Sequence, residues 1–547
     1  MATAENASSE YDKSFFGHPG GLSTLFFTEM WERFSYYGMR ALLVLYMVAE
    51  LTGTRLEDGT IVTNGGMNID TKTATAIYGF YTASVYFLPL IGGWFADRFI
   101  GAKRAMLIGG IVIALGHFTM AIPSDASFFI GLALVAVGTG LLKSNISAMV
   151  GDLYKEGDER RDAGFSIFYM GINLGAFLAP FVCGTLAIFN YHWGFAAAGV
   201  GMVLGLLQYY FGRKKLDGVG EAPVKTELDT SDITPTYLIQ LGVLFVVCIV
   251  IVLAYMFGFA QSETLAERAK ETLTYALPPV MIVGGLVGVL LTGMQDKLNS
   301  DEWKRIGIIV LLFLFAALFW MGFEQAGSSF NLFAEQLTDR DLPGFLSNFV
   351  TSIATFVAGL FGYENIAAIT EFPAEYFQSV NALMIVMLAP LFSILWVKWG
   401  KSQPNDVFKF SLGLLFLALG FVVMAYASGL TGASKVSPWW LIAVYFLHTC
   451  GELFLSPVGL SSMTKLAPGK MISLMLGVWF LASSLGSFAA GIVAGGFEAK
   501  QETLVGMFWN VAIITFIGAA LALILSFVVG GFLKSRQRTA EVPVEPA

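Results

Sequence analysis

Fourteen apolar runs, each about as long as a membrane-crossing helix, recur along the 547-residue chain. The hydrocarbon core of a bilayer is spanned by roughly 20 apolar residues in a helix. Because 56% of the residues are hydrophobic and only 13% are charged, a water-soluble domain is excluded. The sequence therefore predicts an all-α polytopic membrane protein. The predicted spans are 22–50, 74–97, 105–122, 127–150, 164–186, 193–212, 236–258, 273–294, 306–334, 374–397, 406–428, 438–463, 472–495 and 505–533.

The distribution of Lys and Arg predicts how the chain is oriented. Short cytoplasmic loops of membrane proteins carry an excess of Lys and Arg. If the N-terminus is cytoplasmic, most of the 32 basic residues fall in cytoplasmic segments. We therefore expect a cytoplasmic (inner) membrane protein with both termini in the cytoplasm. The N-terminal tail lacks the pattern of a removable signal peptide. The three Cys residues lie in apolar runs and predict neither a disulfide framework nor a metal site.

The first span carries an unusual set of ionisable and aromatic side chains. At helical spacing most of these groups share one face. Each charge at membrane depth costs about 2.5–3.5 kcal/mol on insertion scales, so it is expected to face a cavity and to have a partner. The stripe therefore predicts one wall of a polar site. Its members are Glu29, Glu32, Arg33, Tyr36, Tyr37 and Arg40.

Isolated polar side chains recur in later spans of both halves. Cations lie in the first half, whereas carboxylates lie in both. A cavity that offers positive charge to a carboxylate and negative charge to an amine fits a zwitterionic substrate. These later residues are Lys143, Asn173, Glu324, Asn381, Glu452 and Ser483, with Trp320 and Trp479 as aromatic walls.

A charged, Pro-containing break at 213–235 precedes two uncharged spans that resemble an inserted hairpin. Removing the pair leaves six spans on each side, as in transporters with repeated halves. The predicted units are a tail 1–21, a six-helix bundle 22–212, a linker with the hairpin 213–305, a six-helix bundle 306–533 and a tail 534–547. Residues 92–104 resemble the loop between helices two and three of the major facilitator superfamily, in which Asp97 would bridge helix ends.

Three motifs resemble those of the proton-coupled oligopeptide transporter (POT) family, bacterial type. Residues 29–38 match E-x-x-E-R-F-x-Y-Y-G, and residues 168–175 match F-Y-x-x-I-N-x-G. Residues 451–459 match the tenth-helix pattern of that family. The resemblance covers roughly 20–535 and implies a major facilitator fold that carries di- and tripeptides inward with protons by alternating access.

The resemblance also implies residue roles. Arg33, Tyr37 and Lys143 would contact the peptide carboxylate, and Asn173, Asn381 and Glu452 the amino group. Tyr36, Tyr81, Trp320, Trp479 and Ser483 would shape the pocket. The implied gating pairs are Arg40 with Glu324 and Lys143 with Glu452, and the implied proton-coupling residues are Glu29, Glu32, Arg33, Glu324 and Glu452. Animal members have a second-helix histidine where Gly79 stands here.

Other functions are weighed against this one. A hydrolase would need a nucleophile with a base or a metal motif, and neither occurs in the sequence. A channel would favour a continuous polar pore. Within the transporter class, the alternative substrate is nitrate or another small anion. We expect a functional monomer in the lipid bilayer, driven by the proton gradient, without a cofactor, a metal or nucleic acid. Residues 344–361 are predicted to form an amphipathic or buried helix, to which we assign no function.

Overall fold

The computed structural model describes residues 12–51, 65–155, 158, 160–221, 235–260, 268, 271–272, 276–295, 298–360, 367–432, 434–468 and 471–540. In this part of the chain nearly every element is a helix, and the β structure consists of three isolated bridges. The helices of the first half are α2 (Gly21–Val48), α3 (Thr71–Phe95), α4 (Ala102–Met120), α5 (Asp125–Asp152), α6 (Arg161–Ala187) and α7 (Tyr191–Gly212). Then follow α8 (Pro235–Ala254) and α10 (Leu277–Gln295). The second half has α11 (Ser300–Phe323), α12 (Ser329–Leu337), α13 (Gly344–Leu360), α14 (Gln378–Trp399), α15 (Asp406–Gly429), α16 (Trp439–Leu466), α17 (Ile472–Ala494) and α18 (Gln501–Ala540).

In the part of the chain that the structure describes, all fourteen predicted spans lie on helices. Twelve helices among the described residues are long and apolar enough to cross a membrane. The other two predicted spans are α2 and α10. The charged stripe lowers the hydropathy of α2, and this helix is almost wholly buried, so it needs no continuous apolar surface.

Side-chain caps define several helix starts. Asn299 and Glu302 form a reciprocal capping box at the start of α11. The Asp70 carboxylate accepts from the Thr73 backbone N–H at 2.9 Å at the start of α3, and Asn405 caps α15 in the same way. These contacts satisfy backbone donors that would otherwise have no partner at the helix ends.

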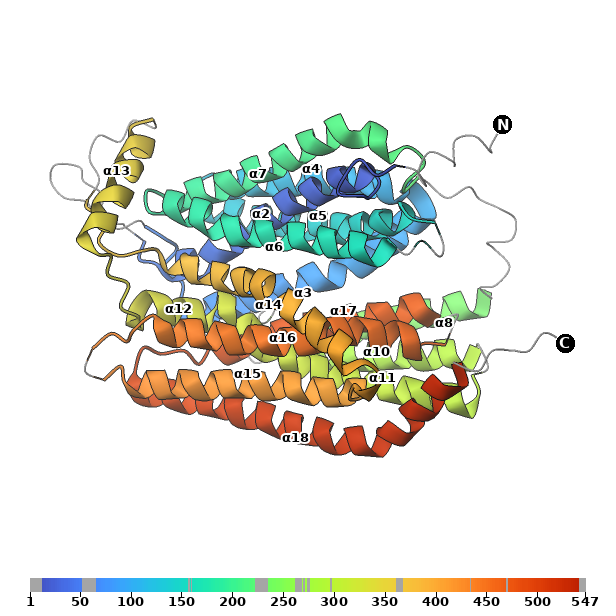
Figure 1. The fold of residues 1–547 in the computed structure, drawn as a ribbon. Coiled ribbons are helices and arrows are strands. Elements are labelled where there is room, and N and C mark those ends of the chain that lie inside the picture. Colours follow the sequence, from blue (N-terminus) through green and yellow to red (C-terminus); the bar gives the residue numbers. More distant parts are fainter. Residues whose placement is uncertain are drawn as a thin grey trace.

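The helices pack as two groups that meet along a long boundary (Figure 1). In the first group α2 packs on α6 and α7, and α4 on α5. In the second group α15 packs on α16 and α18, and α11 on α17. The groups meet where α3 packs on α17 and α6 on α14. The predicted boundaries at 212 and 305 stay predictions, since residues 222–234 of the linker lie outside the described part.

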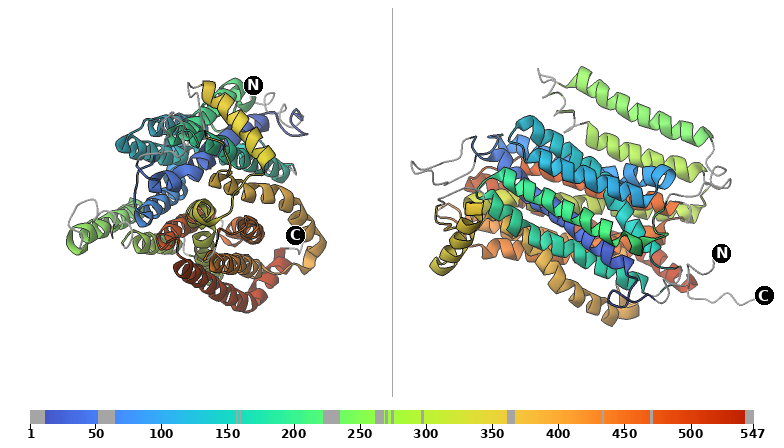
Figure 2. Two further views of the ribbon diagram at one scale, coloured as in Figure 1. Left: turned by 90° about the vertical axis from the view of Figure 1, so that its left-hand side faces the viewer. Right: turned by 90° about the horizontal axis from the view of Figure 1, so that it is seen from above.

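The predicted hairpin occupies the edge of the bundle (Figure 2). Its helices α8 and α10 pack on each other, and α10 also contacts α17. Short η1 (Ala96–Ile100) and Gly101, with a φ of 79°, connect α3 to α4. The predicted bridging by Asp97 lies outside the described side chains.

The two ends of the bundle differ. We call the end at which α2 begins and α18 ends the terminal end, and the opposite end the distal end (Figure 1). Helix α13 lies at the distal end and falls on the predicted segment 344–361. Its Ala354 is fully buried, whereas Phe345, Phe349 and Phe356 are exposed, so this helix is amphipathic.

A short N-terminal strap, residues 12–20, covers the α5–α6 connection at the terminal end. His18 Nδ1 lies 2.9 Å from the hydroxyl of Tyr154, and both residues are buried. Arg160 Nη1 donates to the Gly17 carbonyl at 3.3 Å and is itself paired with Asp158 at 2.8 Å. The strap is therefore held by both polar and charged contacts.

Candidate functional site

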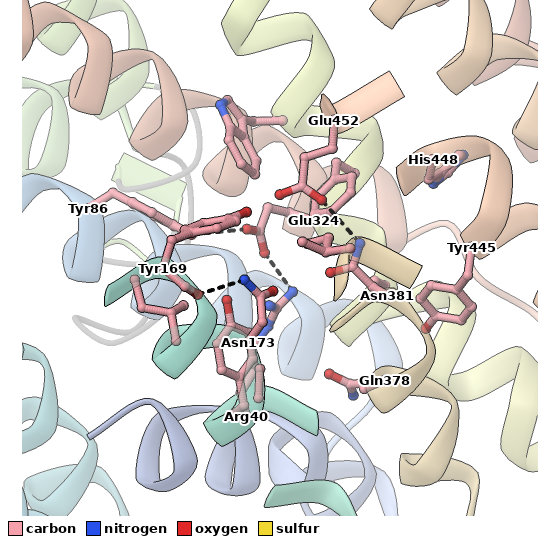
Figure 3. A pocket seen from close by; sticks show the side chains of 17 residues that line it. Arg40, Tyr86, Tyr169, Asn173, Glu324, Gln378, Asn381, Tyr445, His448 and Glu452 are labelled. Atoms are coloured by element: carbon pink, nitrogen blue, oxygen red, sulfur yellow. Dashed lines mark hydrogen bonds and ion pairs between the residues drawn. The ribbon is translucent and has the colours of Figure 1, made fainter. Parts of the chain in front are cut away.

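A cavity of about 120 Å³ lies between the two groups of helices, within the membrane-spanning part. One wall comes from α2, α3 and α6, and the other from α11, α14, α16 and η5 (Glu324–Gly327). Figure 3 shows polar side chains from both walls converging on it. The lining residues are Tyr37, Arg40, Tyr86, Tyr169, Ile172, Asn173, Ala176, Trp320, Phe323, Glu324, Ala326, Gln378, Asn381, Ile385, Tyr445, His448 and Glu452.

An ion pair crosses the cavity between the two halves. Arg40 Nη2 lies 2.7 Å from Glu324 Oε2, and both side chains are buried. Arg40 Nε also donates to the hydroxyl of Tyr78 at 2.7 Å, and Tyr86 donates to Glu324 Oε1 at 3.4 Å. The structure thus brings the first predicted gating pair together; whether it gates remains a prediction.

The second carboxylate of the cavity is Glu452 on α16. It accepts a hydrogen bond from Asn381 Nδ2 at 3.1 Å, and the same amide nitrogen lies 3.0 Å from Thr449 Oγ1. Asn173 lines the opposite wall, where its amide donates to the Tyr169 carbonyl at 2.9 Å. Among the described lining residues, the cavity therefore presents one cation, two carboxylates and the three amides of Asn173, Gln378 and Asn381.

The remaining charges of α2 form a separate cluster that does not line the cavity. Arg33 Nε lies 3.1 Å from Glu29 Oε1 and also contacts the Glu32 carboxylate. All three side chains are buried. A cluster whose three charges leave a net negative charge is costly away from water, so a cation or proton is expected nearby.

Lys143 links this cluster with the cavity. Its ammonium lies 3.9 Å from the ring centroid of Tyr86, whose side chain lines the cavity. A cation over a tyrosine face is attracted by the negative face of the ring. The structure pairs no carboxylate with Lys143 among the described residues, so the predicted pair of Lys143 with Glu452 is not formed in this arrangement.

The predicted aromatic wall is only partly at the cavity. Trp320 lines it, and its Nε1 has no hydrogen-bond acceptor within the described part of the chain. Tyr36 and Tyr81 are buried with unpartnered hydroxyls but are not among the lining residues. Trp479 packs edge-to-face with Phe410, with the ring centroids 6.2 Å apart, and buried Ser483 lies on the same helix as Trp479. None of the described side chains of helix α17 therefore lines the cavity in this arrangement.

Sequence reasoning missed several lining residues, including Tyr86, Tyr169, Gln378, Tyr445 and His448. Tyr78 and Tyr86 stand eight residues apart on α3, a spacing that places them near one helix face. This spacing in the sequence could have predicted that Tyr86 lies near the same site as Tyr78. A single Gln in an apolar span, as at Gln378, carries the same signal as Asn381.

Gly79 lies at a tight crossing of α3 and α17 at the distal end. A Cβ on Gly79 would lie 2.8 Å from the Cα of Gly491 on α17, closer than atoms can pack. A histidine at this position would require α3 and α17 to separate. The glycine at this position therefore allows α3 and α17 to cross closely, which a histidine would prevent.

The model of the POT family matches residues 103–358 and 348–510. The chain is 39% identical over 532 residues to "Peptide transporter YePEPT" of Yersinia enterocolitica subsp. palearctica, covering 94% of this chain and 95% of the relative. The chain belongs to the POT family. A second POT relative, a "Di-/tripeptide transporter" of Lactococcus lactis, is 36% identical and covers 90% of this chain and 92% of its own length.

Solved structures of POT transporters match the same fold. A crystal structure of a peptide transporter POT variant in complex with alafosfalin superposes with a TM-score of 0.79 at 38% identity, covering 97% of this chain and 99% of the other. The predicted all-α major facilitator architecture is confirmed by this match. POT members are transporters rather than enzymes, and the relatives above are named for peptides, which favours peptides over nitrate.

Proposed function

We propose that this POT member carries di- and tripeptides into the cell together with protons, by alternating access. The observation that carries the proposal is the cavity between the halves, where Arg40 faces Glu324 and Asn381 holds Glu452. A peptide is a zwitterion, so its amino group suits Glu452, Asn381 and Asn173. Its carboxylate suits Tyr37 at the cavity together with Arg33 and Lys143, which lie beside the cavity and do not line it in this arrangement.

Proton coupling follows from the charge of the cavity carboxylates, of which Glu324 joins the two halves. The Arg40–Glu324 ion pair is strong only while Glu324 is ionised, because a neutral carboxyl loses most of its attraction for a guanidinium. A proton on Glu324 therefore favours separation of the distal ends, and a proton on Glu452 would weaken the proposed pair with Lys143 wherever that pair forms. Peptide and proton then bias the same equilibrium between two arrangements of the halves.

The cluster of Glu29, Glu32 and Arg33 supplies a second proton-binding group beside the cavity. Its two carboxylates share one guanidinium, so one carboxylate is incompletely neutralised. Lys143 lies close enough for its charge to interact directly with both carboxylates. We propose that a proton on this cluster frees Arg33 or Lys143 to bind the peptide carboxylate.

We place the protein in the cytoplasmic membrane as a monomer, with the terminal end in the cytoplasm and the distal end outside. The excess of Lys and Arg in the terminal-end segments supports this orientation. The proton gradient would supply the driving force, without a cofactor.

Uptake of labelled dialanine into proteoliposomes tests the proposal. Accumulation should rise when an inward pH gradient is imposed and should fall when a protonophore collapses it. Unlabelled dipeptide inside should stimulate uptake by counterflow, whereas nitrate should not compete. Accumulation that is unchanged by the gradient would contradict proton symport, and release of free alanine would indicate an enzyme.

A further inference from the structure

A second contact between the halves lies at the distal end, apart from the Arg40–Glu324 pair. It joins α6 to η6 (Ala374–Phe377) and the start of α14, and we call it the α6–α14 seam. The hydroxyls of Thr185 and Tyr376 lie 2.6 Å apart. Because Thr185 Oγ1 already donates to the Phe181 carbonyl, Tyr376 is the donor in this pair.

Packing and a second hydrogen bond extend the seam toward the cavity. The rings of Phe181 and Tyr376 lie 4.7 Å apart between centroids. One turn deeper, Ser379 Oγ donates to the Phe177 carbonyl at 2.8 Å. Opening the distal end must break all three contacts, since each joins one half to the other.

A carboxyl is buried in this seam. Glu375 is only 6% exposed and lies against Gly184 of α6, where an added Cβ would be 3.4 Å from the Glu375 Cβ. This is an ordinary van der Waals distance, so the Glu375 side chain packs directly against α6. Separating α6 from η6 would therefore expose this carboxyl to water.

The groups around Glu375 only partly offset a negative charge on it, through a hydrogen bond from its own backbone and the attraction of Arg340. The facing titratable and charged groups are Tyr191 at the start of α7, Tyr376 beside it, and Glu335 and Arg340 from the second half. Arg340 Nη2 is paired with Glu335 at 3.0 Å and with Glu371 at 2.9 Å. In the described part of the chain no ion pair reaches Glu375.

We propose that Glu375 is the proton-sensitive residue of a distal latch: the α6–α14 seam closes over its neutral carboxyl and is loosened when that carboxyl ionises. A buried, unpaired carboxylate is costly, whereas the neutral acid is not. The proton is taken up when the seam closes and returned to the same side when it opens. Glu375 therefore sets the response of opening to distal pH and does not itself carry the transported proton. The role as a latch rests on the proposed alternating access.

Hydrogen exchange of the full-length protein in nanodiscs tests the latch without any transport. The peptides that cover 176–190 and 369–382 are followed at pH 5 and pH 8, with rates corrected for the intrinsic effect of pH. We expect opening of the seam to be about tenfold more frequent at pH 8 than at pH 5. This is the change expected when the closed seam binds the proton about tenfold more tightly than the open seam. In Glu375→Gln, whose side chain is neutral at both values, the seam should stay protected at both.

Two variants serve as controls. Glu371→Gln removes a more exposed carboxylate on the same connection and should keep the pH response. Thr185→Val breaks the hydrogen bond between the Thr185 and Tyr376 hydroxyls but leaves Glu375 in place. Hydrogen exchange of the seam should therefore rise at both pH values, while its dependence on pH remains. The proposal is overturned if wild-type exchange does not depend on pH, if the response survives in Glu375→Gln, or if Glu371→Gln abolishes it. Since exchange is read without substrate, a failure of dialanine uptake would reject the transport proposal and leave this result standing.

Discussion

Arg40 and Glu324 are 284 residues apart in the sequence, yet their nitrogen and oxygen lie 2.7 Å apart in a buried ion pair. The pair joins α2 in the first half to η5 in the second half. Tyr78 and Tyr86, both on α3, contact its two ends. This contact is a buried ion pair between the halves, and both of its residues line the cavity.

Neutralising one partner of this pair should destabilise the protein. Arg40→Gln or Glu324→Gln leaves the other charge buried and unpaired, which costs about 3–5 kcal/mol. The double variant removes both charges and should regain part of that stability. Thermal unfolding in detergent measures the effect. A double variant that melts no higher than the less stable single variant would contradict the interpretation of this contact as an ion pair.

Widening the helix crossing at Gly79 should disfavour the distally closed arrangement. In Gly79→Val the added side chain meets the backbone of Gly491, and overpacking of this kind costs about 1–3 kcal/mol. Counterflow of dialanine should slow, because closure of the distal end is a required step. Gly506→Val on α18 is the matched control, since nothing lies within 4 Å of its added carbon. Equal slowing in both variants would show that the crossing is irrelevant.

Replacing Glu452 should abolish gradient-driven accumulation of dipeptide without abolishing counterflow. Glu452→Gln keeps a hydrogen-bond acceptor for Asn381 but cannot ionise. We expect gradient-driven uptake to be lost while counterflow is retained. Asn381→Leu instead removes the donor that orients Glu452, and should raise the KM for dipeptide in both assays. Full accumulation by Glu452→Gln would remove this carboxylate from the coupling mechanism.

The N-terminal strap should undock in acid. Burial, together with the positive charge of Arg160, lowers the pKa of His18 below its ordinary value, although Asp158 opposes the effect. Undocked His18 therefore binds a proton at higher pH than docked His18. Docking is fully stable above about pH 6.5 and weakens as the pH falls below that value. Hydrogen exchange of residues 12–20 at pH 5.5 and 7.5 measures this, and His18→Phe should remove the pH dependence. Equal protection of the wild type at both pH values would refute it.

Sequence patterns located most of the charged site, because ionisable groups inside spans are costly and stand out. The i to i+4 spacing of Glu29 and Arg33 predicted that they share a face, and they form an ion pair. The contact of Arg40 with Glu324 followed from the family resemblance alone, since no local spacing links two halves of a chain.

The aromatic wall was harder to predict because hydropathy does not fix how a helix is rotated about its axis. Trp479 was expected at the cavity but packs on Phe410, whereas Tyr86 was not expected and lies between Lys143 and Glu324. The α6–α14 seam also escaped prediction, since hydroxyl pairs such as Thr185 with Tyr376 have no distinctive pattern in a sequence.

Helix α2 runs from Gly21 to Val48 without an internal proline. Arg33 and Arg40 lie seven residues apart on it, nearly two turns and about 10 Å along the axis. The two guanidiniums are thus fixed points on a single stiff rod. A tilt or rotation of α2 that moves one guanidinium therefore also moves the other, and no intervening side chain has to transmit the motion.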